Sequence, residues 1–506
     1  MRTKNMFKVK KLIVALMGCL FFTVSLAQKP NILFVFADQL RSQELSCYGG
    51  VNIKTPNLDR LADEGLMMTN AISTYPICSP FRGMLLTGLY PLKSGISNND
   101  HPLNPELPSF AKSCKKEGYN TAYIGKWHID GIGRTAYIPE ERRLGYDHWQ
   151  ALECTHNYFK SLYFHNNEVE PKYWKGFDAE AQTKAAQDYI RARDTEKPFF
   201  LTLSWGPPHD PYIAPQEYMD KVEPKKLILR ENVTEHLMEE ELQNNPRFKI
   251  PERYIHSHAK LRVRAKDENI IRKRYAGYLA ATLALDDYIG ELLQTLEEEG
   301  ILDNTIVVFT SDHGDQLGSH QFYGKNVPFA ESISIPFLVR YPKVLKQGTI
   351  ADNLLSPIDM FSTVFGMANI DHHEIDGVDL TPAIVNEAVD ARDAILLMNL
   401  THFNNTSLIN GLDTYRGIQT KKYTYARYED KTPWLLFDNE NDPFQVNNLV
   451  GNSAYTGLIK TLDKKLDKLL IEAQDPENTK EIYDRIMREN PKRIMVNEFR
   501  KVNPDL

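Results

Sequence analysis

Polar residues that could carry out chemistry follow four apolar runs of the sequence. Asp38 and Gln39 follow "NILFVFA", Lys126 and His128 follow "TAYIG", His209 follows "FFLTLSWGPP", and Asp312 and His313 follow "TIVVFTS". A single residue of this kind is often only a helix cap or part of the scaffold. Independent caps are not expected to supply carboxylates, an amide, a lysine and histidines at four strand ends. The set therefore predicts a site.

The residue types indicate what this site could bind. The oxygens of Asp38, Gln39 and Asp312 suit a hard divalent cation, and the absence of a Cys/His cluster with zinc spacing argues against zinc. Calcium is the expected ion, ahead of magnesium. The cationic side chains suit an oxyanion such as phosphate or sulfate; they are Arg82, Lys126 and Lys325. Histidines could move protons near neutral pH.

Cys78 begins a predicted helix in "YPICSPFRGMLLTGLYP", residues 75–91. Pro80 suits the first helical turn, and Gly88 before Pro91 ends the helix. A helix N-terminus favours an anionic group, yet a thiolate beside a hard cation is mismatched in softness. From its surroundings alone, Cys78 could be a buried thiol, a disulfide partner or a reactive atom, and the strand-end residues favour the last of these.

These residues require a scaffold of buried strands. The apolar runs alternate little, as in strands covered on both faces, and helical segments lie between them. We therefore predict an α/β domain with a large, mostly parallel sheet flanked by helices, which binds ligands at the carboxyl ends of its strands. Beyond about residue 410, alternating runs and a helix predict a smaller α+β domain with an antiparallel sheet. That helix places Leu458, Leu462, Leu466 and Leu469 on one face.

Length and composition set further limits. The chain has 506 residues with 42% hydrophobic and 25% charged residues, and its net charge of −7 gives no basic surface for nucleic acid. We expect a leader at residues 1–27, a catalytic domain at 28–410 and the smaller domain at 411–506. A polar segment at about 222–270 is either a solvated excursion or a loop arm that shapes substrate choice.

The N-terminus indicates export. A cationic stretch precedes the apolar run "LIVALMGCLFFTVSLA", and Ser25 and Ala27 supply small residues at the cleavage positions. The run is short for a membrane span, so we expect a periplasmic or secreted protein. Lipid attachment at Cys19 is less favoured because the run continues past it. With Cys78 set aside, at most one disulfide could form among Cys47, Cys114 and Cys154.

Six motifs, in order, resemble those of the type I sulfatases. "CSPFR" fits their C-x-P-x-R signature, and the others are "KPNILFVFADQLR", "GYNTAYIGKWH", "PPHDPY", "TSDHGDQLG" and the C-terminal "LFDNENDPFQVNNL". The resemblance implies the alkaline phosphatase-like fold. It also implies hydrolysis of sulfate esters through a covalent sulfate intermediate, after a maturation enzyme has oxidised Cys78 to formylglycine, whose hydrate is the nucleophile.

The resemblance also assigns roles to residues. Asp38, Gln39, Asp312 and His313 would hold calcium together with the modified Cys78. Arg82 and Lys126 would hold the hydrated aldehyde and the sulfate, and Asp312 would help to activate the attacking hydroxyl. His209 and Lys325 would contact the sulfate and the leaving oxygen, with His209 as the acid. His128 would take a proton from the second hydroxyl and so expel the sulfate.

Three positions depart from the family pattern. Gln39 stands where many members have aspartate, and His313 where many have asparagine, so the metal site would carry less negative charge. Imidazole is a poor partner for calcium. Phe81 stands where serine or alanine is common, although Cys78, Pro80 and Arg82 are intact. We expect maturation to survive, with a different yield or enzyme preference.

Two other functions stay open: a phosphodiesterase or phosphonate monoester hydrolase of the same superfamily, and a non-catalytic, exported glycan-binding protein. For the sulfatase, we expect a sulfated carbohydrate from glycosaminoglycans, mucin or algal polysaccharide. Aromatic and polar side chains near the mouth of the site suit a sugar. The candidates for binding it are Asn99, His101, His148, Trp149 and His320.

Overall fold

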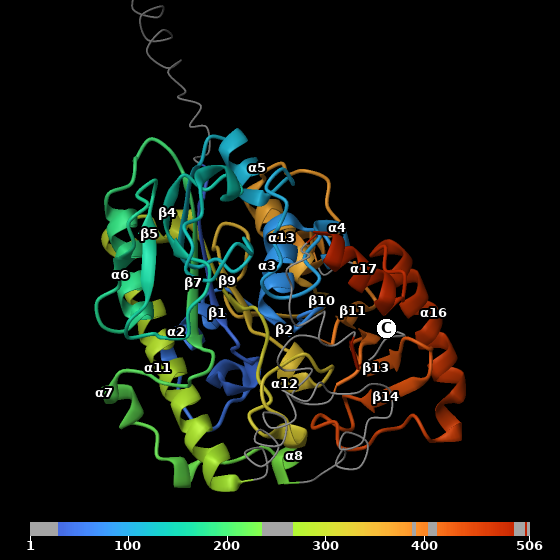
Figure 1. Cartoon of the computed structure of the whole chain (residues 1–506). Helices are drawn as coiled ribbons and strands as arrows, with labels where there is room; N and C mark the ends of the chain where they lie inside the picture. The colour runs from blue at the N-terminus through green and yellow to red at the C-terminus, as the bar shows by residue number, and fades with distance from the viewer. Residues whose placement is uncertain (1–28, 235–266, 387–390, 403–411, 490–500, 503–506) are drawn as a thin grey trace, which may run out of the picture.

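The computed structural model describes residues 29–234, 267–386, 391–402, 412–489 and 501–502 (Figure 1). A ten-stranded sheet runs through the larger part of the molecule. Its strand order is β10 (Thr349–Leu355), β2 (Leu66–Ala71), β9 (Phe337–Arg340), β8 (Thr305–Ser311), β1 (Asn31–Asp38), β7 (Phe199–Pro208), β3 (Asn120–Lys126), β4 (His148–Leu152), β5 (Leu162–His165) and β6 (Lys172–Tyr173).

The centre of this sheet is parallel, as predicted. Strand β1 pairs in parallel with β7 and β8, and β3 pairs in parallel with β7 and β4, whereas β9, β5 and β6 run antiparallel to their neighbours. Both faces of β1 are covered: Leu33 and Val35 join one hydrophobic cluster, and Phe34 and Phe36 join another. Burial on both sides explains why the apolar runs lack alternation.

Helices cover the two faces in separate groups. One face carries α2 (Pro56–Asp63), α6 (Asp178–Arg191) and α11 (Glu268–Glu298), and the other carries α3 (Cys78–Thr87), α5 (Phe110–Lys116) and α13 (Pro357–Ala368). Shorter helices lie at α4 (Pro91–Ser94), α7 (Gln216–Met219), α8 (Glu231–Thr234), α12 (Ala330–Ile333) and α14 (Thr381–Asn386). The α/β architecture is therefore confirmed.

A second, antiparallel sheet forms the C-terminal side of the molecule (Figure 1). It contains, in order, β11 (Ile395–Asn399), β12 (Tyr415–Gln419), β13 (Tyr423–Tyr428) and β14 (Pro433–Asp438), followed by helices α16 (Thr456–Glu472) and α17 (Thr479–Glu489). The sheet begins at β11, before residue 411, where the sequence places the boundary. Helix α16 buries Leu462, Leu466 and Leu470, and Leu458 and Leu469 pack half-buried against the same cluster.

The leader expected at residues 1–27 lies outside the described residues, as do residues 235–266 of the polar segment. In the part of the chain that is described, no helix has both the length and the apolar character needed to cross a membrane. Cys47, Cys78, Cys114 and Cys154 are all free thiols in the structure.

Asp178, at the start of α6, predicts a pH-dependent stability. The residue is 1% exposed, and its Oδ1 has no hydrogen-bond partner in the structure. Burial raises its pKa to about 8, although hydrogen bonds from Ser161 and the helix backbone oppose this. An unfolded aspartate has a pKa of about 3.9, so the folded state binds one more proton between these values. The stability of the protein must therefore fall as the pH rises from about 4 to about 8.

We expect Asp178→Asn to remove this loss, because asparagine has a similar shape and no charge to bury. Relative to the wild type, the variant should gain about 2 to 5 kcal/mol in unfolding free energy between pH 5 and pH 8.5. Urea unfolding at several pH values measures this difference. Parallel stability curves for the two proteins would contradict the prediction.

Candidate active site

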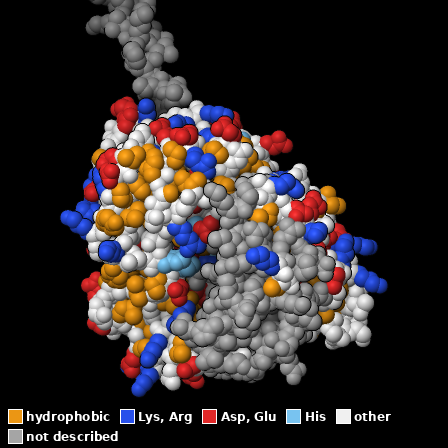
Figure 2. Space-filling view, viewed as in Figure 1, with side chains coloured by type: hydrophobic (Ala, Val, Ile, Leu, Met, Phe, Trp, Pro, Cys, Tyr) orange, Lys and Arg blue, Asp and Glu red, His pale blue; other side chains and the backbone are white. Residues whose placement is uncertain are grey.

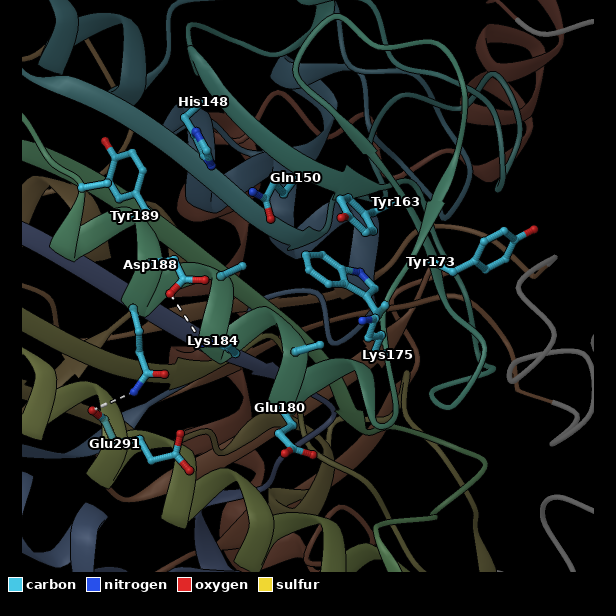
Figure 3. Close-up of a pocket in the computed structure, with 15 residues that line it drawn as sticks. His148, Gln150, Tyr163, Tyr173, Lys175, Glu180, Lys184, Asp188, Tyr189 and Glu291 are labelled. Carbon is cyan, nitrogen blue, oxygen red and sulfur yellow. Dashed lines mark hydrogen bonds and ion pairs between the residues drawn. The ribbon is translucent and has the colours of Figure 1, made fainter.

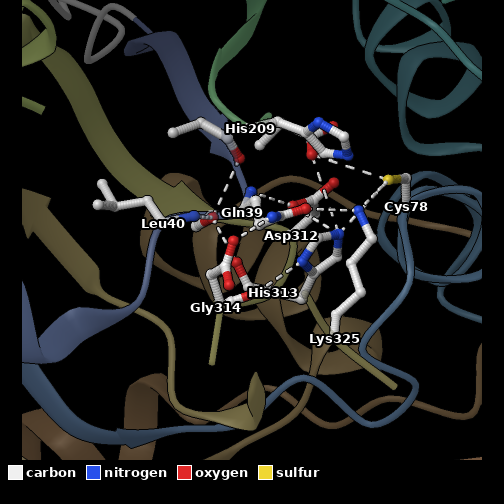
Figure 4. A network of polar contacts seen from close by, with 12 residues as sticks. Gln39, Leu40, Cys78, His209, Asp312, His313, Gly314 and Lys325 are labelled. Carbon is white, nitrogen blue, oxygen red and sulfur yellow. Dashed lines mark hydrogen bonds and ion pairs between the residues drawn. The ribbon is translucent and has the colours of Figure 1, made fainter. Parts of the chain in front are cut away.

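The ends of four adjacent strands bring the predicted site residues together. In the sheet order β8-β1-β7-β3, the strands end at or beside Asp312, Asp38, His209 and Lys126. Figure 2 shows histidine and basic side chains near the centre of one face, and Figure 4 shows the network of polar contacts that includes Cys78, His209 and Asp312. The parallel centre of the sheet therefore creates the constellation that the sequence predicts.

Cys78 is the first residue of α3 and is 1% exposed. Its Sγ lies 3.3 Å from Lys325 Nζ, 3.4 Å from His313 Nε2, 3.7 Å from Asp38 Oδ1 and 3.8 Å from Lys126 Nζ. Burial and Asp38 oppose ionisation of the thiol, but Lys126, Lys325 and His313 outweigh them and hold the pKa of Cys78 well below its ordinary value. This position stabilises negative charge.

Four of these residues could hold a metal ion. Asp38, Cys78, Asp312 and His313 each offer one ligand atom, and these atoms all lie within 4.8 Å of one another. His313 donates from Nδ1 to the carbonyl oxygen of Gly314 at 3.0 Å, so in the neutral ring Nε2 keeps a lone pair directed at the group. Two carboxylates and an imidazole nitrogen fit a divalent cation.

Arg82 donates hydrogen bonds to both carboxylates and is also one of the cationic side chains that suit an oxyanion. It donates from Nη2 to Asp38 at 3.0 Å and to Asp312 at 3.3 Å, and from Nη1 to Ser204 at 2.8 Å. Lys126 Nζ reaches Asp38 Oδ2 at 2.6 Å. Burial and the neighbouring Asp38 raise the pKa of Asp312 to about 6, whereas Lys126 is the main cause that lowers the pKa of Asp38 despite its burial. The two carboxylates thus differ in their readiness to bind a proton.

Gln39 is held by partners that its position in the sequence does not reveal. Its backbone is left-handed, with φ of 71°, and its N–H donates to Asp312 Oδ1 at 2.9 Å. Its side-chain oxygen accepts from Lys325 Nζ at 2.7 Å, and its amide nitrogen donates to the buried carboxylate of Asp315. Tyr212 donates to the same carboxylate. Asp315 therefore fixes the orientation of Gln39, and through it the position of Lys325.

We expect Asp315→Asn to lower kcat/KM by about 10- to 100-fold. Its new amide would face the donors of Gln39 and Tyr212, and leaving buried groups unpaired costs about 1–3 kcal/mol. Tyr212→Phe is the matched control, because it removes one donor and leaves Gln39 held; it should cost less than about fivefold. Steady-state kinetics and thermal melting of both variants test this. Equal losses in the two variants would contradict the role.

His128 is oriented by Asp100 and Arg134, a pair that no sequence pattern indicates. Its Nε2 lies 3.2 Å from Asp100 Oδ1, and Arg134 donates twice to Asp100, each time at 3.1 Å. Burial opposes charge on the ring, yet Cys154 and the hydrogen bond with Asp100 raise the pKa of His128 well above its ordinary value. No strand-end or spacing signal marks Asp100 or Arg134, because their contact depends on how two loops meet.

His209 is held from two sides. Its Nδ1 donates to the carbonyl oxygen of Asp210 at 2.8 Å, and its ring stacks on His156 with a centroid separation of 4.5 Å and an angle of 13°. Burial and the charge of Lys325 lower the pKa of His209 well below its ordinary value. The ring is therefore fixed in place and neutral in the free protein at pH 7.

The five candidates for sugar binding occupy different places. Asn99 lies beside Cys78 and accepts from the N–H of Ser79 at 2.9 Å, and His101 is buried next to Ser97. His320 is buried against Phe329 and contacts Asn232. Trp149 is fully buried in an aromatic cluster with Tyr123 and Trp127. His148 faces a separate groove. The structure thus brings only Asn99 next to the cluster around Cys78.

Phe81 has a structural reason for its presence. It is fully buried and belongs to the hydrophobic cluster under α3, together with Leu85 and Ile96. Replacing a buried phenylalanine by a small residue typically costs about 3–5 kcal/mol. A test of its effect on the modification of Cys78 by Phe81→Ser must therefore correct for lost stability.

Comparison with family models places most of the chain in known families. A model described as sulfatase matches residues 30–370, and one described as N-sulphoglucosamine sulphohydrolase, C-terminal, matches residues 318–474. An ulvan-active sulfatase of Formosa agariphila is 39% identical over 464 residues, which are 90% of this chain and 84% of the relative. An endo-4-O-sulfatase of Bacteroides thetaiotaomicron is 30% identical, over 91% of this chain and 96% of the relative.

Solved structures agree with these matches. A protein in complex with its substrate D-glucosamine-2-N,6-O-disulfate superposes with a TM-score of 0.76 at 26% identity, over 89% of this chain and all of that one. A phosphonate monoester hydrolase of Agrobacterium radiobacter has a TM-score of 0.69 at 21% identity, over 88% of this chain and 96% of that one. The second likeness shows a shared fold alone.

Proposed function

The chain belongs to the sulfatase family, and we propose that it is an exported enzyme that removes sulfate esters from a carbohydrate by means of a formylglycine made from Cys78. Its activity as a sulfuric ester hydrolase on sulfated carbohydrates follows from the family and from the relatives. The proposal adds the nucleophile, the metal, the roles of individual residues and the location.

One observation carries the proposal: the side chain of Cys78 meets two lysines, a histidine and an aspartate within 3.8 Å while it is 1% exposed. A buried thiol needs no such surroundings, and as a soft thiolate it would be poorly matched to a hard cation. Formylglycine would supply a hydrated aldehyde with one hydroxyl to attack sulfur and a second to release the product. A maturation enzyme must make it.

The neighbouring residues then have different roles in the reaction. Arg82 and Lys126 are both held in place by buried hydrogen bonds to Asp38. Their fixed positive charges would orient the sulfate and the modified side chain at position 78. Asp312, a carboxylate close to the side chain at position 78, helps to take the proton of the attacking hydroxyl. Lys325, 3.3 Å from Sγ, contacts the sulfate.

The two histidines act at different moments. His209 protonates the leaving oxygen of the sugar, since a bound sulfate ester brings negative charge next to it and counteracts the lowering of its pKa. His128 takes a proton from the second hydroxyl when the sulfate leaves, which requires a neutral ring and therefore a pH high enough to overcome its raised pKa. Its hydrogen bond with Asp100 fixes the ring for that transfer and stabilises the charge that it acquires.

A divalent cation would complete the site. Asp38, Asp312, His313 and the oxygen at position 78 would hold it, with Gln39 able to offer an amide oxygen. It would supply electrophilic stabilisation of charge on the sulfate. We propose calcium, because most of the offered ligands are oxygens, with magnesium as the less favoured ion. The leader at residues 1–27 would export the protein to the periplasm or beyond.

The test is turnover of defined sulfated mono- and oligosaccharides by the converted enzyme, with Cys78→Ala as the blank. We expect sulfate release from at least one sugar. A 4-nitrophenyl phosphodiester measured in parallel addresses the phosphodiesterase and phosphonate hydrolase alternative. Preference for the phosphodiester would reject the sulfatase assignment, and release of sulfate from none of the sugars would reject the carbohydrate substrate. An unmodified Cys78 in protein from the native host would favour the non-catalytic glycan-binding protein.

A further inference from the structure

A cavity of about 900 Å³ lies between helix α6 and the edge strands β4, β5 and β6 (Figure 3). We call it the α6 groove. Its His148 end lies apart from the catalytic cluster, because His148 pairs with Ala122 on β3, four residues before Lys126. Four residues of strand span about 13 Å. The groove is therefore a separate feature of the surface.

The shape of the α6 groove follows from alternation in the strands and from small residues in the helix. His148 and Gln150 face the groove, whereas Trp149 between them points into the core on the other side. From α6, Ala181 and Ala185 line the cavity, and their small side chains leave room between helix and sheet. The hollow therefore results from small side chains on the regular helix α6.

Pairs of aromatic rings line both ends of the α6 groove. The rings of Tyr163 and Trp174 stack at 3.9 Å with an angle of 18°, and those of His148 and Tyr189 lie 4.9 Å apart at the other end. Figure 3 places Tyr163 and Gln150 on the strand side, and Asp188 and Glu180 on the helix side. Aromatic faces with a few carboxylates and amides suit the apolar faces and hydroxyls of sugar rings.

The charge of the α6 groove separates it from the catalytic site. The described residues that line it include three carboxylates, two lysines and no arginine; the charged ones are Lys175, Glu180, Lys184, Asp188 and Glu291. Lys184 lies 3.6 Å from Asp188. Burial and the neighbouring His165 lower the pKa of His148 to about 4, so it adds no charge at neutral pH. A sulfated ligand would meet no excess of positive charge here.

Trp174 lines both the α6 groove and a small cavity beside Lys126. Gly206 also lines this small cavity. A glycan chain bound in the groove would therefore contact Trp174, whose side chain also lines the small cavity beside Lys126. That placement suits a neighbouring part of the polymer that the catalytic site attacks.

We propose that the α6 groove is a second glycan-binding site that holds an uncharged stretch of oligosaccharide, next to the site that removes sulfate. The inference rests on the proposed carbohydrate substrate. It predicts that the enzyme keeps hold of a polymer through units that carry no sulfate, while the cationic catalytic site accepts the sulfated unit. Turnover of a polymer should then depend on the groove more than turnover of a single sulfated sugar.

The test uses the full-length Cys78→Ala protein, so that binding is measured without turnover. Cellohexaose, xylohexaose, agarohexaose and chitohexaose are titrated by calorimetry. We expect at least one to bind, Tyr163→Ala to weaken that binding by about tenfold or more, and Tyr163→Phe to preserve it, because phenylalanine keeps the ring. Ala185→Trp should block binding by filling the hollow without removing any lining side chain.

Binding of none of the four oligosaccharides would overturn the proposal, as would binding that both Tyr163→Ala and Ala185→Trp leave unchanged. Thermal melting of each variant identifies any that fails to fold. The two substitutions act by opposite means, because Tyr163→Ala removes a ring and Ala185→Trp fills the space. Failure of the sulfatase function would appear separately, as absent sulfate release by the wild type from every sulfated sugar, whatever the outcome of the titrations.

Discussion

Replacing Cys78 by alanine is expected to lower kcat/KM for any sulfate ester by at least about 10⁴-fold, the scale on which enzymes lose activity when a nucleophile is removed. Alanine removes the reactive atom and leaves Lys126, Lys325 and the carboxylates in place. Because the pocket keeps its charges, the variant should still bind a sulfated sugar. The substitution should therefore abolish turnover and leave substrate binding intact. Kinetic assays and calorimetry on the same preparation measure these two properties.

The control asks which form of position 78 is active. Wild-type protein made with and without a formylglycine-generating enzyme should differ in activity in proportion to the modified fraction, in which one oxygen replaces sulfur and two hydrogens. Peptide mass spectrometry measures that fraction. Full activity in protein whose Cys78 is unmodified would reject the formylglycine and leave the thiolate, with its lowered pKa, as the nucleophile.

The second large effect concerns His209. We expect His209→Ala to lower kcat for a sugar sulfate by about 10²- to 10⁴-fold, since a sugar alkoxide is a poor leaving group and needs a proton. The same variant should lose less than about tenfold on 4-nitrophenyl sulfate, because that phenolate leaves without protonation. Comparison of kcat on the two substrates gives the measurement.

His128→Ala is the matched control for this experiment. If His128 acts only after the leaving group has departed, its removal must slow the release of sulfate equally for both substrates. Equal losses in His209→Ala on the two substrates would contradict its assignment as the acid. A large difference in His128→Ala would instead exchange the roles of the two histidines, in the direction that its raised pKa favours.

The predictable part of the site is the part that follows from local sequence. Buried strands show as apolar runs, and parallel neighbours end at one edge, so the sequence alone places Asp38, Lys126, His209 and Asp312 together. The large sheet and the antiparallel C-terminal sheet follow from the same patterns. The beginning of the second sheet at β11 does not, because its buried residues form a short apolar run without the alternation that marks the later strands.

The unpredicted part depends on contacts between distant segments. Asp315 reaches Gln39 across 276 positions, and Arg134 meets Asp100 through two loops. Trp149 is a candidate for sugar binding in the sequence because it is aromatic and follows His148. Which face of β4 it occupies depends on the strand's register against β3, and that register turns Trp149 inward and His148 outward.

The near-complete burial of Cys78 also limits when its proposed conversion to formylglycine could take place. A side chain that is 1% exposed at the first turn of α3, covered by Lys126, Lys325 and His313, is out of reach of any second protein once the sheet has closed over it. The conversion of Cys78 that we propose would therefore have to come before the chain folds. The order of biosynthesis would then be fixed: the modified residue would be made on an open chain and enclosed afterwards, and a molecule that folded first would stay inactive.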